Sequence, residues 1–87
     1  MDRQQFEGFA ETIVRIFRNQ GEDEAVAERD RINRELAEKN LYLWFQGPVG
    51  GSYLAFFLSD TSTQPAREVY RHTIRWVSLR AHLIAPR

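Results

Sequence analysis

Residues 41–58 read LYLWFQGPVGGSYLAFFL, two aromatic-rich runs around a break with one proline and three glycines. Aromatic and branched side chains suit β-strands, and a proline–glycine break between two such runs indicates a turn. The sequence therefore predicts a β-hairpin over 41–58. The break lacks the lysine and hydroxyl spacing of a nucleotide-binding loop, so we do not expect it to bind phosphate.

Both faces of this hairpin are apolar. Alternate residues of a strand point to opposite faces, so Leu43 and Phe45 share one face while Tyr42 and Trp44 share the other. A hairpin with one face in water would alternate apolar and polar residues, and its open edges would tend to recruit another strand. The two apolar faces therefore need to be shielded from water. The chain's own helices can cover them, or an edge-to-edge homodimer with a four-stranded sheet, or a different protein.

Residues 3–20 and 23–39 are predicted to form two helices before the hairpin. In the first, apolar residues such as Phe6 and Phe17 recur at helical spacing and gather on one side, which is expected to face the core. Gly21 ends this helix, because glycine accepts the backbone conformation found at helix C-termini. The second helix carries many acid–base pairs at i, i+4 spacing and a narrow apolar stripe, a pattern typical of a solvated outer helix.

A final helix is predicted over 65–83. A run of residues that can cap a helix precedes Pro65, which fits the first turn. On such a helix, three arginines at every fourth position form a basic stripe and a fourth falls on the apolar side; in chain order these are Arg67, Arg71, Arg75 and Arg80.

Charge is divided unevenly along the chain. Residues 1–40 hold seven basic and ten acidic groups, whereas 61–87 hold five arginines and one glutamate. Like charges at i, i+4 on a helix repel one another. The arginine stripe therefore needs neutralisation, either by acidic residues of the second helix or by an external polyanion or acidic protein surface.

The composition limits the class of protein. A chain of 87 residues suits a single domain, 1–87, and the predicted order α-α-β-β-α is an α+β fold. Twelve basic and twelve acidic residues cancel, so the net charge does not indicate nucleic acid or an anionic membrane. There is no apolar run of about 18 residues to span a membrane, and the N-terminus does not resemble a signal peptide. We therefore expect a cytoplasmic protein.

The residue types that catalysis requires are not grouped in this sequence. Cysteine is absent, which excludes disulfides and thiolate metal sites. His72 and His82 lie too far apart to form a metal-binding pair on one helix turn, and no hydrolase, zinc-protease or nucleotide-binding motif occurs. We expect no enzyme activity, no metal and no cofactor.

These observations predict a small non-enzymatic module that binds another protein as an inhibitor, adaptor or regulator and that forms a homodimer. Phage or mobile-element inhibitors of host proteins share this size and composition, which is an analogy only. The alternative is a dimeric nucleic-acid-binding protein that uses the basic C-terminal helix, although such domains normally carry excess positive charge. The candidate contact residues are Tyr42, Trp44, Tyr53, Phe56, Arg67, Arg71, Arg75 and Arg80.

Overall fold

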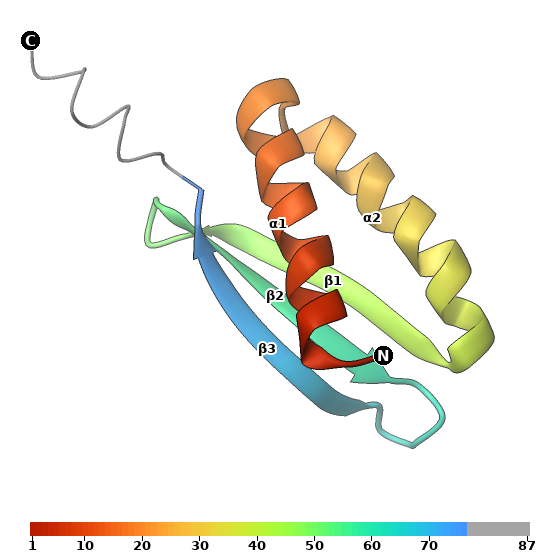
Figure 1. Cartoon of the computed structure of the whole chain (residues 1–87). Helices are drawn as coiled ribbons and strands as arrows, with labels where there is room; N and C mark the ends of the chain where they lie inside the picture. The colour runs from red at the N-terminus through yellow and green to blue at the C-terminus, as the bar shows by residue number, and fades with distance from the viewer. Residues whose placement is uncertain (77–87) are drawn as a thin grey trace, which may run out of the picture.

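Two helices followed by a three-stranded antiparallel sheet make up the part of the chain that the computed structural model describes, residues 1–76 without the side chain of Val49. The sheet has the strand order β1-β2-β3, and Figure 1 shows both helices on the same side of it. The α+β class predicted from the sequence is confirmed. The elements are α1 (Arg3–Gln20), α2 (Glu22–Leu36), a 3-10 turn η1 (Ala37–Lys39), β1 (Leu41–Val49), β2 (Tyr53–Asp60) and β3 (Arg67–Arg75).

Local signals set the ends of the helices. The Asp2 carboxylate accepts a hydrogen bond from the backbone N–H of Gln5 at 2.8 Å, and the Gln5 side chain accepts one from the Asp2 N–H at 3.1 Å. This capping box satisfies N–H groups that the first turn leaves without partners. At the other end Gly21 has φ 101°, a value that favours glycine. Asn40 ends η1 in the left-handed conformation, with φ 58°.

The core lies between the two helices and one face of the sheet. Phe6 and Ile13 of α1 and Ile32 of α2 are fully buried, together with Leu54 and Phe56 of β2. The apolar side of α1 is therefore core, as its spacing predicts. The helices cover one of the two apolar faces of the hairpin, and within residues 1–76 no other element covers the second face.

The predicted helix over 65–83 is wrong for 67–75, which form β3 along the free edge of β2. Residues 77–83 of that prediction, with Arg80, lie outside the described residues. From Tyr70 to Trp76, side chains that are cyclic or aliphatic alternate with arginine or threonine, which is the period of a strand rather than of a helix. A spacing of four places the arginines on one side in either structure, so it did not distinguish the two.

A β-bulge interrupts the pairing of β2 with β3. Leu58 pairs with Tyr70 but its neighbour Ser59 pairs with Glu68, so Val69 is an extra residue on β3. Such an insertion reverses the side to which the following residues point. Residues of β3 before and after Val69 therefore do not keep a simple alternation along the strand.

The turn between β2 and β3 is organised by Asp60. Its Oδ1 accepts hydrogen bonds from the Ser62 hydroxyl at 2.6 Å and from the Ser62 backbone N–H at 2.9 Å. These bonds, with a smaller contribution from Arg67, lower the pKa of Asp60. A lowered pKa in the folded state stabilises the protein above the ordinary carboxyl pKa of about 4, and this stabilisation is lost as the pH falls through the folded value.

We expect Ser62→Ala to raise the pKa of Asp60 toward its ordinary value. The Ser62 hydroxyl lowers that pKa more than the Ser62 backbone N–H does, and the substitution removes the hydroxyl. The measurement is an NMR titration of the Asp60 side-chain carboxyl. Thr61→Ala is the matched control, since the Thr61 hydroxyl donates to Asn40 instead. An Asp60 pKa that is the same in both variants would contradict this account of the turn.

Candidate functional site

The sheet face opposite the helices, called the open face below, is the candidate site. Alternation and strand register determine its members. Tyr42 and Tyr53, near opposite ends of the face, are each 42% exposed and are the exposed large apolar side chains of the described chain. The open face consists of Tyr42, Trp44 and Gln46 of β1, Tyr53, Ala55, Phe57 and Ser59 of β2, and Glu68, Arg71, Thr73 and Arg75 of β3.

A row of three large side chains crosses the middle of the open face. Trp44, Phe57 and Arg71 are direct neighbours on the three strands. The rings of Trp44 and Phe57 are stacked with centroids 4.7 Å apart and planes 20° from parallel. The Arg71 guanidinium carbon lies 5.4 Å from the Phe57 ring centroid, within the range of a cation–π contact. This row is therefore ordered before any partner arrives.

The basic groups of the open face lie on β3. The Arg71 Nε and Nη2 donate hydrogen bonds to the Glu68 carboxylate at 3.2 and 3.1 Å. The Arg71 side chain nevertheless remains 65% exposed. Arg75 is also exposed and lies opposite Tyr53. Because an exposed ion pair contributes little free energy, Glu68 leaves Arg71 accessible to another carboxylate.

The predicted stripe of three arginines is not continuous. The bulge at Val69 separates Arg67 from the other two, and Arg67 pairs across the strands with Asp60, its Nη2 lying 3.6 Å from the Asp60 carboxylate. Two arginines rather than three therefore share the open face.

The open face brings together five of the eight candidate contact residues. These are Tyr42, Trp44, Tyr53, Arg71 and Arg75.

Phe56 is the candidate that the structure contradicts. Its side chain is 0% exposed and its ring lies 5.5 Å from Phe45 in the core. In the observed register Phe56 pairs with Phe45 and Phe57 pairs with Trp44, so Phe57 is the site residue that the sequence prediction missed. The signal that identifies it is size, since Leu54, Phe56 and Leu58 together form the bulkier face of β2.

Helix side chains occupy the outer edges of the sheet. At the β1 edge, the Asn33 amide donates to the Leu43 carbonyl and accepts from the Leu43 N–H, both at 2.7 Å. At the β3 edge, Arg18 donates to the Trp76 carbonyl at 2.8 Å and Arg3 to the Arg71 carbonyl at 3.1 Å. An added strand would use these same backbone groups. The predicted edge-to-edge arrangement of two copies would have to displace these contacts.

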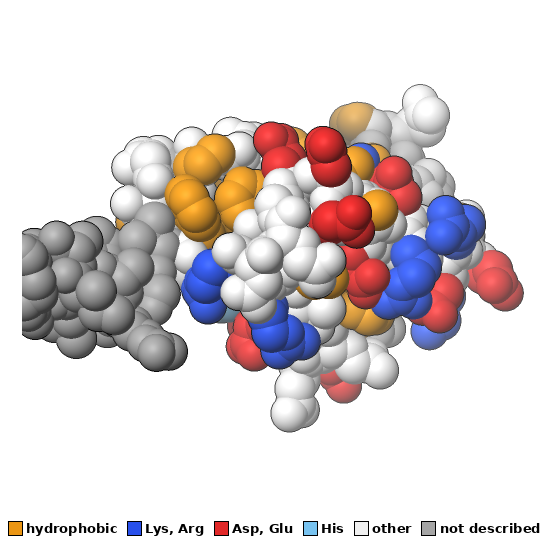
Figure 2. Space-filling model, turned by 90° about the horizontal axis from the view of Figure 1, so that it is seen from above, with side chains coloured by type: hydrophobic (Ala, Val, Ile, Leu, Met, Phe, Trp, Pro, Cys, Tyr) orange, Lys and Arg blue, Asp and Glu red, His pale blue; other side chains and the backbone are white. Residues whose placement is uncertain are grey.

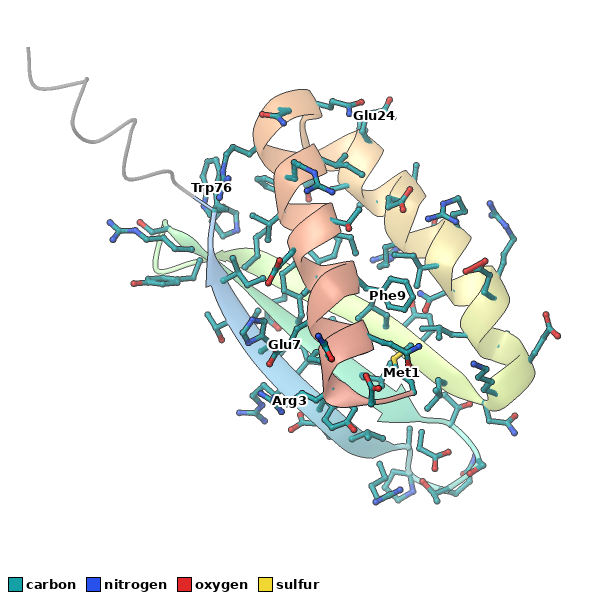
Figure 3. The ribbon with its side chains drawn as sticks, in the orientation of Figure 1. Met1, Arg3, Glu7, Phe9, Glu24 and Trp76 are labelled. Carbon is teal, nitrogen blue, oxygen red and sulfur yellow. The ribbon has the colours of Figure 1, made fainter. Side chains whose placement is uncertain are left out.

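The helix side has a hollow of about 410 Å³ between the start of α1 and the end of α2. Met1, Phe9 and Leu36 line it together with charged groups such as Glu35 and Lys39, and Figure 3 shows Met1 and Phe9 in this region.

In residues 1–76 no three metal-ligating side chains come together. Within the same residues, no helix has the length and the apolar character of a membrane-spanning segment.

Comparisons with protein-family models, with curated proteins and with solved structures found no match for this chain. The functional interpretation therefore depends on the geometry of the open face.

Proposed function

We propose that this chain is a non-enzymatic protein-binding module, an inhibitor, adaptor or regulator of another protein, and that the open face is its contact surface. One observation carries the proposal: an ordered aromatic sheet face that no element within residues 1–76 covers. A cytoplasmic location, and a role like that of phage or mobile-element inhibitors of host proteins, suit the size and composition and belong to the same proposal.

The physical gain lies in burying the aromatic side chains. Complete burial of one large apolar side chain contributes about 1.5–3 kcal/mol, and tyrosine and tryptophan carry much of the binding energy of many interfaces. Because Trp44 is already stacked on Phe57, binding would cost little side-chain ordering. Tyr42 and Tyr53 would add contacts near the two ends of the face.

The other predicted partners have less support. Nucleic-acid binding relied on a basic helix, but 67–75 form a strand and Arg67 is separated from Arg71 and Arg75. The homodimer stays a prediction. The contacts of Asn33 with Leu43 oppose its edge-to-edge arrangement, because an added strand would have to displace them.

The test is photo-crosslinking in host cells with benzoylphenylalanine placed at Tyr53. The matched control carries the same residue at Arg15, an exposed position on α1. We expect protein adducts from position 53 and not from position 15, and we expect Trp44→Ala to abolish them in a variant that circular dichroism shows to be folded. Equal adducts from both positions, or adducts to nucleic acid alone, would contradict the proposal.

A further inference from the structure

We infer that the partner presents an acidic segment with large apolar side chains to the open face. The apolar side chains would lie on the aromatic residues, and the carboxylates would bind Arg71 and Arg75. This inference rests on the proposed function and adds to it the chemistry of the partner.

Charge complementarity is the first argument. The open face has two arginines and one glutamate, an excess of one positive charge. The chain up to residue 40, which contains both helices, has seven basic and ten acidic groups. Acidic residues form the whole first turn of α2, at Glu22, Asp23 and Glu24, and Figure 2, which views this end of the molecule, shows acidic side chains gathered there among basic ones.

This distribution favours an acidic segment over a second copy. Two open faces packed together would bring Arg71 and Arg75 of both copies to one interface, with one glutamate from each copy to balance them. Like charges at an interface oppose association, whereas complementary charges favour it and speed the encounter. An acidic segment is therefore the occupant that matches the charge of this face.

The fixed position of Arg71 is the second argument. Its guanidinium is held between the Phe57 ring and the Glu68 carboxylate. A guanidinium has five N–H donors, and the two bonds to Glu68 use only Nε and Nη2. The remaining donors, on a side chain 65% exposed, can bind a second carboxylate without rearrangement. The same side chain borders Phe57, which is itself stacked on Trp44, so an acidic group and an apolar group of one segment can bind side by side.

The experiment uses two fluorescein-labelled synthetic peptides with identical leucine and phenylalanine positions, one with glutamate and one with lysine at the remaining positions. Binding to the full chain is measured by fluorescence anisotropy. We expect the glutamate peptide to bind at least about tenfold more tightly, a difference of about 1.4 kcal/mol.

Charge-changed variants locate the binding site. Arg71→Glu with Arg75→Glu is expected to weaken binding of the glutamate peptide at least about tenfold. Arg15→Glu with Arg34→Glu makes an equal charge reversal on the exposed side of the helices. This control is expected to leave the affinity for the glutamate peptide unchanged. Arg71→Gln with Arg75→Gln removes the charges without placing new acids beside Glu68. This pair decides the result if the reversed variant does not fold.

Four results of the binding measurements would overturn the inference. They are equal binding of the two peptides, no binding of either, an affinity that the open-face variants do not change, and tighter binding of a labelled thymidine oligonucleotide than of the glutamate peptide. Self-association that Trp44→Ala abolishes and that the glutamate peptide does not displace would identify a second copy as the occupant, which also overturns it. Adducts from position 53 to a different protein would still support the proposed function in each case, so the two failures are distinguishable.

Discussion

Phe56→Ala is expected to lower the free energy of unfolding by about 3–5 kcal/mol. The Phe56 side chain is 0% exposed and packs beside Phe45 and the buried face of α1, so its removal leaves a cavity that the backbone cannot close. The total free energy of unfolding of a small domain is about 5–15 kcal/mol. The loss is therefore a large fraction of that free energy, and urea denaturation followed by circular dichroism measures it.

Phe57→Ala is the matched control, because it makes the same change at the next residue on the opposite face. Phe57 is half-buried and its ring is stacked on Trp44. We expect a clearly smaller loss of stability, which includes about 0.5–1.5 kcal/mol for the stacked pair, together with weaker binding to the open face. Equal losses of stability in the two variants would contradict the register in which Phe56 faces the helices.

Phe56 and Phe57 show how much of the candidate site can be predicted from the sequence. Alternation along β2 separates Phe56 from Phe57, but it does not say which of them shares a face with Trp44. That depends on the register of β1 against β2, which is fixed by the turn at 47–52 and by packing against the helices. The pattern could thus predict the hairpin, the outward Tyr42, Trp44 and Tyr53 and, because Phe57 alternates in step with Tyr53, the outward phenylalanine, but not the register that pairs Phe57 with Trp44.

The third strand shows a different limit. Arg67, Arg71 and Arg75 recur at every fourth residue, a spacing that fits a helix face and a strand face alike. The deciding signal was the alternation from Tyr70 to Trp76 together with the need of β2 for a second neighbour. The sequence predicted that the hairpin edge would recruit a strand. It did not show that the strand belongs to the same chain, nor that the bulge at Val69 would divide the arginines.

Asn33→Ala is also expected to lower the free energy of unfolding substantially. The Asn33 amide is the side chain that binds both backbone groups of Leu43 at the outer edge of β1. Its removal leaves a partly buried N–H and carbonyl without these partners, and each such group costs about 1–3 kcal/mol. The sequence gives no sign of this role, because Asn33 occurs among the charged residues of α2 and its partner is ten residues away.

The same variant should also self-associate. With the Asn33 contacts removed, the β1 edge can pair with the β1 edge of another copy, which the parent chain prevents. Urea denaturation measures the loss of stability and sedimentation velocity measures the association. Asn19→Ala, the same change at an exposed site on α1, is expected neither to lower the stability nor to cause self-association. A stable, monomeric Asn33→Ala variant would show that these two hydrogen bonds do not protect the edge.

Combining Asn33→Ala with Trp44→Ala separates the two routes to assembly. Pairing through the β1 edge uses backbone groups, so loss of the Trp44 side chain from the open face should leave it intact. Packing through the open face depends on that side chain and should disappear. Association that persists in the double variant therefore assigns the edge as its route, and it leaves the open face, with Arg71 and Arg75 at its β3 side, available to the acidic partner.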